Sequence, residues 1–215
     1  AIDGNLHGSP AALALAADVA DYRSVADMVG RVVEEYGRVD ILVNNAGIYQ
    51  SCFFEEMREE EWDRVVGVNL KGTFNCCKAV IPIMKQNRGG KIINASSFAA
   101  IMPSVGVAAY ASAKAGVIAL TKVLAGELGP YGIRVNAYVP GTIETPMTQK
   151  ARERYGDSLK RSIASGRYGT PEEVAKVVVF LASDMASYVN GAVVEVTGGK
   201  FAVQDAWAAY SRVLS

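Results

Sequence analysis

The stretch ILVNNAG, residues 41–47, is an apolar run that ends in a short polar turn. A strand that is apolar throughout, rather than at alternate positions, is expected when helices cover both faces of its sheet. Asn and Gly both tolerate left-handed backbone conformations, so the last four residues are typical of a turn after a strand. The stretch therefore predicts a buried strand of a parallel sheet, followed by an exit loop.

Outward from this stretch, short apolar runs alternate with longer amphipathic ones. The alternation predicts an α/β fold with a doubly wound, Rossmann-like parallel sheet. Glycine commonly follows the end of a helix and proline is favoured in a first turn, which helps to set the boundaries. Strands are expected at about 12–17, 41–43, 91–95, 133–139 and 192–196, and helices at about 22–36, 59–87 (interrupted near Gly67, bent near Pro82), 108–128 and 171–183.

The size and charge of the chain limit what it can be. Its 215 residues, 50% of them hydrophobic, suffice for one sizeable hydrophobic core and are too few for two domains of ordinary size. Its 22 Lys and Arg balance 22 Asp and Glu, and no segment gathers positive charge into a stripe. Nucleic acid is therefore not an expected partner. The longest apolar runs fall far short of the ~20 residues of a membrane-spanning helix, so no membrane segment is expected.

The cysteines and the histidine bear on redox state and metals. Cys52, Cys76 and Cys77 include no Cys-x-x-Cys pair, and reduced thiols in a cytoplasm fit them best. His7, the only histidine, lies in an opening segment rich in Gly, Ser and Pro and is expected to be a solvated loop residue. Because metal sites usually need clustered ligands, no metal site is predicted.

Tyr110 and Lys114 are candidates for acid–base chemistry. Four residues apart on a predicted helix, they share one face. An ammonium beside a phenol favours the phenolate, so we expect Lys114 to pull the pKa of Tyr110 below its usual value of about 10. Tyr110 then becomes a general acid or base. The pattern arises by chance too often to carry this interpretation alone.

Other polar residues stand where a parallel sheet binds ligands. Ser97 directly follows the strand expected at 91–95, at the carboxyl edge of the sheet, where a hydroxyl can hold a substrate oxygen. A simple turn at a strand end explains the same residue. Asn69 lies inside a long apolar helix, where Asn is unfavourable and ordinarily points to solvent; a role in a site is the alternative.

Taken together and in this order, these residues resemble the short-chain dehydrogenase/reductase family. The resemblance covers about residues 13–200 and predicts an enzyme that transfers a hydride between a nicotinamide cofactor, NAD or NADP, and a carbonyl compound or secondary alcohol. The motifs that carry it are Asn44-Asn45-Ala46-Gly47, Asn69-Leu70-Lys71-Gly72, the spacing of Ser97, Tyr110 and Lys114, the run Val135 to Gly141, Thr145-Pro146-Met147 and Gly198-Gly199.

The resemblance implies a role for each matching residue. Tyr110 is the expected proton donor or base, Lys114 lowers its pKa and binds the nicotinamide ribose, Ser97 steadies the substrate oxygen, and Asn69 holds a water of a proton relay. The stretch 148–169 resembles a substrate lid. The residues expected along the cofactor, besides Tyr110 and Lys114, are Asp18, Val19, Asn45, Ala46, Gly47, Pro140, Gly141, Ile143 and Thr145.

The chain departs from the family pattern at its N-terminal end. No glycine stands two residues from another, so the Gly-x-Gly turn that cradles a pyrophosphate is missing, and the family's first strands would lie before residue 1. We interpret Gly4-x-x-x-Gly8 as a chance imitation in an irregular segment, 1–11. Without the turn, we expect weakened cofactor binding, a strand at 12–17 without its partner, and an exposed apolar edge at 41–43.

Three hypotheses follow. The leading one is a single, N-terminally incomplete domain of an NAD(P)-dependent enzyme, most like ketoacyl reductases and sugar or polyol dehydrogenases, with a weak preference for the former. The second is an inactive pseudoenzyme or oligomerisation module, and the third an enzyme with a pyrophosphate site rebuilt from residues 1–10. The helices at 59–87 and 108–128 resemble those that pair subunits, which predicts a homodimer or homotetramer in the cytoplasm. A helix at 202–215 is expected to pack on a neighbouring subunit.

Overall fold

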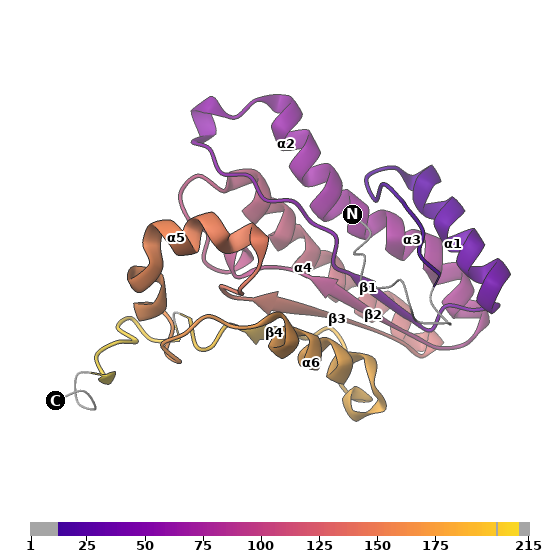
Figure 1. Cartoon of the computed structure of the whole chain (residues 1–215). Coiled ribbons are helices and arrows are strands. Elements are labelled where there is room, and N and C mark those ends of the chain that lie inside the picture. The colour runs from indigo at the N-terminus through magenta and orange to yellow at the C-terminus, as the bar shows by residue number, and fades with distance from the viewer. Residues whose placement is uncertain (1–12, 201, 211–215) are drawn as a thin grey trace.

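The computed structural model describes residues 13–200 and 202–210. Its centre is a parallel sheet in which the strands lie side by side in chain order. Figure 1 shows helices packed on both sides of this sheet. The strands are β1 (Ile41–Asn44), β2 (Gly90–Ala95), β3 (Ile133–Pro140) and β4 (Val193–Val196).

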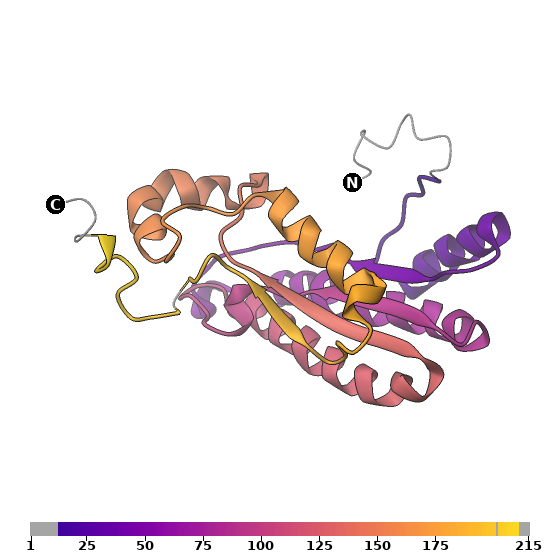
Figure 2. The same cartoon turned by 90° about the horizontal axis from the view of Figure 1, so that it is seen from below.

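Helices cover the two faces unequally. On one face α3 contacts β1 and β2, α4 contacts β2 and β3, and α1 packs on α3; on the other face α6 contacts β2, β3 and β4 (Figure 2). The doubly wound α/β fold predicted from the sequence is confirmed. The helices are α1 (Tyr22–Tyr36), α2 (Glu59–Val66), α3 (Gly72–Gln86), α4 (Ala108–Leu128), α5 (Pro146–Arg161) and α6 (Pro171–Ala182).

Local capping explains why several helices begin and end where the sequence predicted. The Asp21 carboxylate accepts a hydrogen bond from the Arg23 amide at the start of α1, and Gly37 ends this helix in a left-handed conformation with φ of 75°. At α6, Thr170 and Glu173 form a capping box around Pro171 in the first turn. Such signals depend on neighbouring residues alone, so they can be read from the sequence.

The expected interruption near Gly67 is a π-helical segment, Gly67–Lys71, between α2 and α3. π-Helical turns inside α-helices are frequent at functional sites. Asn69 lies in this segment and is fully buried rather than turned to solvent. The helix α3 continues through Pro82 to Gln86.

A chain of buried polar side chains connects the sheet to α4. The Asn44 amide donates to Asn94 Oδ1 at 2.8 Å, the Asn94 amide donates to Thr121 Oγ1 at 2.9 Å, and the Thr121 hydroxyl donates to the Val117 carbonyl at 2.8 Å. Because each buried polar group finds a partner, the cost of burying it is offset. This chain ties the end of β1 through β2 to the helix that carries Tyr110 and Lys114.

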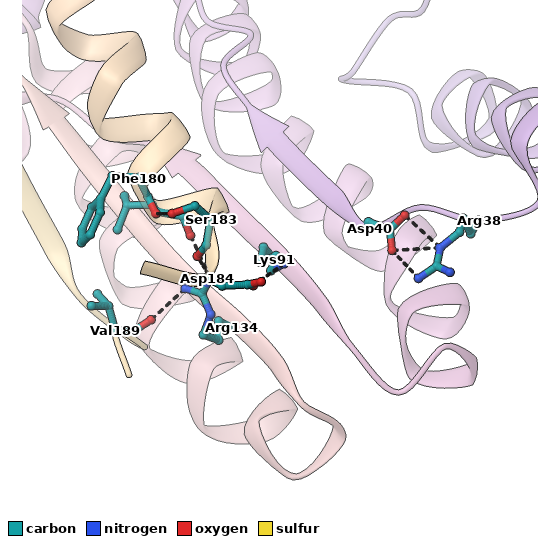
Figure 3. Close-up of polar contacts among 9 residues, drawn as sticks. Arg38, Asp40, Lys91, Arg134, Phe180, Ser183, Asp184 and Val189 are labelled. Atoms are coloured by element: carbon teal, nitrogen blue, oxygen red, sulfur yellow. Dashed lines mark hydrogen bonds and ion pairs between the residues drawn. The ribbon is translucent and has the colours of Figure 1, made fainter. Parts of the chain in front are cut away.

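Arg134 anchors the segment that follows α6. Its guanidinium donates to the carbonyls of Leu181, Ser183 and Val189, and Asp184 pairs with Lys91 on β2 at 3.2 Å (Figure 3). The guanidinium thereby satisfies carbonyls that the end of α6 leaves without helical partners.

The strand expected at 12–17 is wrong for the residues that the structure describes. Residues 13–18 form no strand, and residue 12 lies outside the described part. A strand needs a neighbour for its backbone groups, and among the described residues no strand pairs with the outer edge of β1. Ile41 and Val43 are accordingly 45% and 41% exposed. The apolar edge expected at 41–43 is therefore confirmed, and helices cover only one face of β1.

Two further expectations differ from the structure. Most of the stretch 148–169 belongs to α5, a helix that the sequence analysis did not expect; Pro146 stands in its first turn. No helix forms over residues 202–209, which make turns and bends. Some expectations fall outside the described residues. These are the irregular segment 1–11 with Gly4, Gly8 and His7, and a pyrophosphate site in residues 1–10.

The helix α4 is strongly apolar. By length and composition alone, Ala108–Tyr131 is long and apolar enough to cross a membrane. A helix in the core of a folded domain has the same composition, and α4 packs on β2 and β3 with Ala113, Val117 and Leu128 buried. The packing accounts for the composition of α4.

We predict that Asn94→Ala lowers the free energy of unfolding by about 2–3 kcal/mol, because it strips the buried Asn44 amide and Thr121 hydroxyl of a partner. Urea unfolding followed by circular dichroism measures this change. Asn87→Ala, at the exposed end of α3, is the matched control and is expected to change the value by no more than about 0.5 kcal/mol. Equal effects of the two substitutions would contradict a stabilising role for the polar chain.

Candidate active site

A cavity of about 760 Å³ opens at the carboxyl ends of β1, β2 and β3. This is the edge at which open parallel sheets bind ligands. Its volume falls within the range of small-molecule sites, about 300–1,000 Å³. The wall contains the following residues that the sequence predicted for the site: Asn45, Gly47, Ser97, Tyr110, Lys114, Pro140, Gly141, Ile143 and Thr145.

Lys114 lies on α4, one turn after Tyr110, and is 4% exposed. Its ammonium donates a hydrogen bond of 2.8 Å to the carbonyl of Ala95, the last residue of β2. Burial lowers the pKa of Lys114 to about 8, because a charged amine loses its hydration there. Near neutral pH, Lys114 therefore carries a proton that it can release more easily than an ordinary lysine.

Tyr110 is buried in the same wall, with its ring edge-on to Tyr49 at 5.2 Å between ring centroids. Burial raises the pKa of Tyr110; a hydrogen bond with Ser97 acts in the opposite direction, and Tyr49 raises it further. The expectation that Lys114 lowers the pKa of Tyr110 is therefore wrong for this structure, in which desolvation is the largest effect. The ammonium lies 5.9 Å from the centre of the Tyr110 ring and is bonded to Ala95 instead.

Ser97 lies just after the end of β2 and lines the same cavity as Tyr110. Its hydroxyl also accepts a hydrogen bond from the Ala99 amide at 3.2 Å, which caps a short 3₁₀ turn at Phe98–Ala100. Ser97 therefore caps a turn at the end of a strand and also lies in the site beside Tyr110. Ser97 and Tyr110, thirteen positions apart in the sequence, converge on one place.

Asn69 lies behind the cavity wall. Its amide donates to the carbonyls of Ile48 and Val65, each at 2.9 Å, and its Oδ1 is buried without a hydrogen-bond partner among the described residues. This oxygen faces Gly47: a Cβ at position 47 would come within 2.8 Å of it and 3.5 Å of Lys114 Nζ. Only glycine fits at position 47 without displacing Asn69 Oδ1.

Three of the residues expected along the cofactor lie outside the cavity wall. Asp18 accepts a hydrogen bond from the Ala20 amide, and Val19 packs against Gly72 and accepts a bond from Asn75 at 2.8 Å. Ala46 is exposed between Asn45 and Gly47. The cofactor roles of Asp18, Val19 and Ala46 stay predictions.

The structure adds wall residues that the sequence analysis did not single out. Tyr138, on β3, donates a hydrogen bond from its hydroxyl to Asn45 Oδ1 at 2.6 Å. Its place inside the run from Val135 to Gly141 was the available signal. Much of the remaining wall is apolar, and α5 and α6 contribute Met147, Ala151, Leu159, Val174 and Val178 to it.

These residues fit the nicotinamide end of a dinucleotide cofactor. The buried Asn69 Oδ1, the cradle that only Gly47 permits, and the buried ammonium of Lys114 offer an acceptor, a close backbone approach and a donor. Gly141 also lines the cavity, and its missing Cβ lets the Thr197 backbone pack close behind it, since a Cβ there would lie 2.9 Å from the Thr197 Cα. For the pyrophosphate, the described residues show no Gly-x-Gly turn, as the sequence predicted.

Known proteins of similar sequence are reductases. The family described as enoyl-(acyl carrier protein) reductase matches residues 5–200. A 3-oxoacyl-[acyl-carrier-protein] reductase of Thermotoga maritima is 49% identical over 182 residues, which are 85% of this chain and 74% of the relative. One from Staphylococcus epidermidis is 44% identical over 188 residues, covering 87% of this chain and 77% of the relative.

A solved structure is similar over the same part. The gluconate 5-dehydrogenase of Burkholderia cenocepacia J2315, in complex with NADP and tartrate, superposes with a TM-score of 0.84 at 33% identity, over 86% of this chain and 74% of that one. The parallel sheet and its helices are thus shared with an oxidoreductase that binds a nicotinamide cofactor. None of these relatives supports an inactive pseudoenzyme or a pure oligomerisation module.

We predict that the burial of Lys114 shows in the pH dependence of stability. Its pKa falls from 10.5 to about 8 on folding, so the cost of burying the charge is present below about pH 8 and disappears as the pH rises toward 10.5. Between these values the native protein should gain about 3 kcal/mol of unfolding free energy relative to Lys114→Met.

Urea unfolding at pH 7, 8, 9 and 10 measures this gain. Lys122→Met, on the exposed face of α4, is the control and should leave the pH dependence unchanged. If the curves of the wild type and Lys114→Met run parallel over this range, the proposed charge burial is wrong.

Proposed function

Because the chain belongs to the short-chain dehydrogenase/reductase family, we propose that it reduces the carbonyl group of a 3-oxoacyl thioester, with NADPH as the coenzyme. The observation that carries the proposal is the convergence of Ser97 and Tyr110 on the wall of one cavity, much of whose remaining wall is apolar. A phenol and a hydroxyl together can hold and protonate one oxygen.

In this proposal each polar residue has a separate task. A nicotinamide coenzyme held beside Gly47 and Lys114 would supply the hydride for the carbonyl carbon. Ser97 donates a hydrogen bond to the carbonyl oxygen, and Tyr110 transfers its phenolic proton to that oxygen, which becomes the hydroxyl of the product. Lys114 holds its proton beside Ala95, and Asn69 offers its buried oxygen to a bridging water. The raised pKa of Tyr110 suits an acid that must be protonated before the reaction begins.

The apolar wall supports an acyl substrate. Met147, Leu159, Val174 and Val178 line the side of the cavity formed by α5 and α6, where an alkyl chain is favoured and sugar hydroxyls would lack partners. Most of the stretch 148–169, which we propose is the substrate lid, belongs to α5. The relatives from Thermotoga and Staphylococcus are named as reductases of 3-oxoacyl groups.

A sugar or polyol dehydrogenase is the second candidate, because the similar gluconate 5-dehydrogenase acts on a polyhydroxy acid by its name. The same structure holds NADP, which supports NADPH over NADH in our proposal. The free thiols Cys52, Cys76 and Cys77 support a cytoplasmic setting.

We predict that the chain oxidises NADPH in the presence of a short 3-oxoacyl thioester and that Tyr110→Phe lowers kcat by roughly 10²- to 10⁴-fold, the usual contribution of a general acid. Binding of NADPH, followed by its fluorescence, should change little in this variant. Tyr22→Phe, on α1 and remote from the cavity, is the matched control and should keep full activity.

The outcomes separate the hypotheses. Turnover of gluconate but not of the thioester favours the second candidate. Binding of NADPH without turnover of either would contradict the proposed reaction, and a Tyr110→Phe variant as active as the wild type would contradict the assignment of the acid.

We also propose a homodimer that pairs the outward faces of α3 and α4. Phe74 and Val123 are 44% and 56% exposed there. A shallow hollow of about 210 Å³ between the two helices is lined by Phe74, Cys77, Lys78, Ile81, Pro82, Leu120 and Leu124. Apolar surface of this kind is typical of contacts between identical subunits.

For this interface we predict that Val123→Glu shifts the solution mass from dimer, or tetramer, toward monomer, because it places a charge on an apolar contact. Light scattering after gel filtration measures the mass. Met185→Glu, at an exposed apolar position after α6, is the control and should leave the mass unchanged. A monomeric wild type would contradict the proposal outright.

A further inference from the structure

Tyr138 takes no part in the proposed proton transfer. It is 3% exposed, lies on β3 and points its hydroxyl at Asn45, in the loop after β1. We propose that Tyr138 is a positioning residue: its phenol holds the loop 45–47 in place from across the sheet, and so fixes the Gly47 wall of the cavity.

The register of the sheet explains how β3 reaches this loop. Asn44 pairs with Asn94, and Ala95 pairs with Tyr138, so that Asn45, Ala95 and Tyr138 follow one line across three strands. The first and last of these strands lie about 10 Å apart, two strand spacings. Because the middle residue is only alanine, the Tyr138 ring can pass over it to Asn45.

The loop needs such support because β1 is the edge of the described sheet. Asn44 is held by Asn94, but the next residues, Asn45 and Ala46, are exposed. The bond from Tyr138 is 2.6 Å long and comes from a ring packed among Ile93, Ala95 and Leu181. A rigid buried donor on β3 thus restrains an exposed acceptor at the sheet edge.

The donor keeps its proton over the whole working range. Burial, with a smaller effect of Tyr110, raises the pKa of Tyr138 to about 12. The phenol therefore acts as a neutral hydrogen-bond donor and not as a second acid.

The restraint of the loop matters for the site because Gly47 packs closely against Asn69. A shift of this loop changes the space between Gly47, Asn69 Oδ1 and Lys114 Nζ, where a Cβ at position 47 would come within 2.8 Å of Asn69 Oδ1. We expect Tyr138 to influence cofactor affinity through this space without touching the reacting atoms. This consequence rests on the proposed function, whereas the restraint of the loop does not.

Hydrogen exchange followed by mass spectrometry tests the restraint in the full chain without cofactor. In Tyr138→Phe, amides 45–48 should exchange roughly 3- to 10-fold faster, which corresponds to the loss of one hydrogen bond of about 0.5–1.5 kcal/mol. Tyr168→Phe is the matched control: it removes an equally buried phenol that donates to the Gly156 carbonyl at 2.9 Å, and it should leave these amides unchanged. Unchanged exchange in Tyr138→Phe overturns the proposal.

Variants at Asn45 keep the test decisive if Tyr138→Phe fails to fold. Asn45 is exposed, so Asn45→Ala should fold and show the same faster exchange, whereas Asn45→Asp retains an acceptor and should restore slow exchange. Slow exchange in Asn45→Ala counts against the proposal.

Titration of NADPH fluorescence then tests the consequence for the site. Tyr138→Phe should raise the Kd roughly 3- to 10-fold and leave the pH profile of kcat unchanged, and Tyr138→Phe in the Asn45→Ala background should add nothing. If the wild type binds no NADPH, the proposed function fails while the exchange data still decide the role of Tyr138. Additive effects of the two substitutions on exchange would overturn the proposal.

Discussion

The buried ammonium of Lys114, bonded to the carbonyl that ends β2, is the constraint on which the site depends. Burial of a charged amine is unfavourable unless a partner compensates, and Ala95 supplies that partner at a fixed point of the sheet. The bond joins α4 to the end of β2. Tyr110, one helical turn earlier, is thereby brought beside Ser97, which leaves the same strand two residues later. One contact therefore places three polar groups around one cavity.

The same burial decides the chemistry of the pair. It raises the pKa of Tyr110 and lowers that of Lys114, so both shifts favour the neutral forms. A protonated phenol is ready to give its proton to a substrate oxygen, and an amine whose pKa is about 8 can gain or release a proton near neutral pH. Before a substrate binds, the acid of such a site is already protonated, which suits the reduction of a carbonyl.

Much of the fold could be predicted because its signals are local. Asp21, Gly37 and Pro171 mark helix ends through their own backbone preferences, and α1 and α4 have the expected bounds. The strand at 12–17 was wrong because a strand also needs a partner, which no local pattern supplies. In the site, spacing along α4 predicted that Tyr110 and Lys114 share a face. It did not predict their pKa values, since desolvation depends on everything packed around them.

The least supported part of the described sheet carries a wall of the cavity. The edge strand β1 pairs with β2 alone, and Ile41 and Val43 remain about half exposed on one face, at 45% and 41%. Its end is nevertheless held from two directions: Asn44 is bonded to Asn94 on the side of α3 and α4, and Asn45 to Tyr138 on the side of α6. Both bonds cross strands, so they depend on register and were not visible in the sequence. Because Gly47 follows at once, the precision of the site is decided by contacts that lie outside its reacting groups.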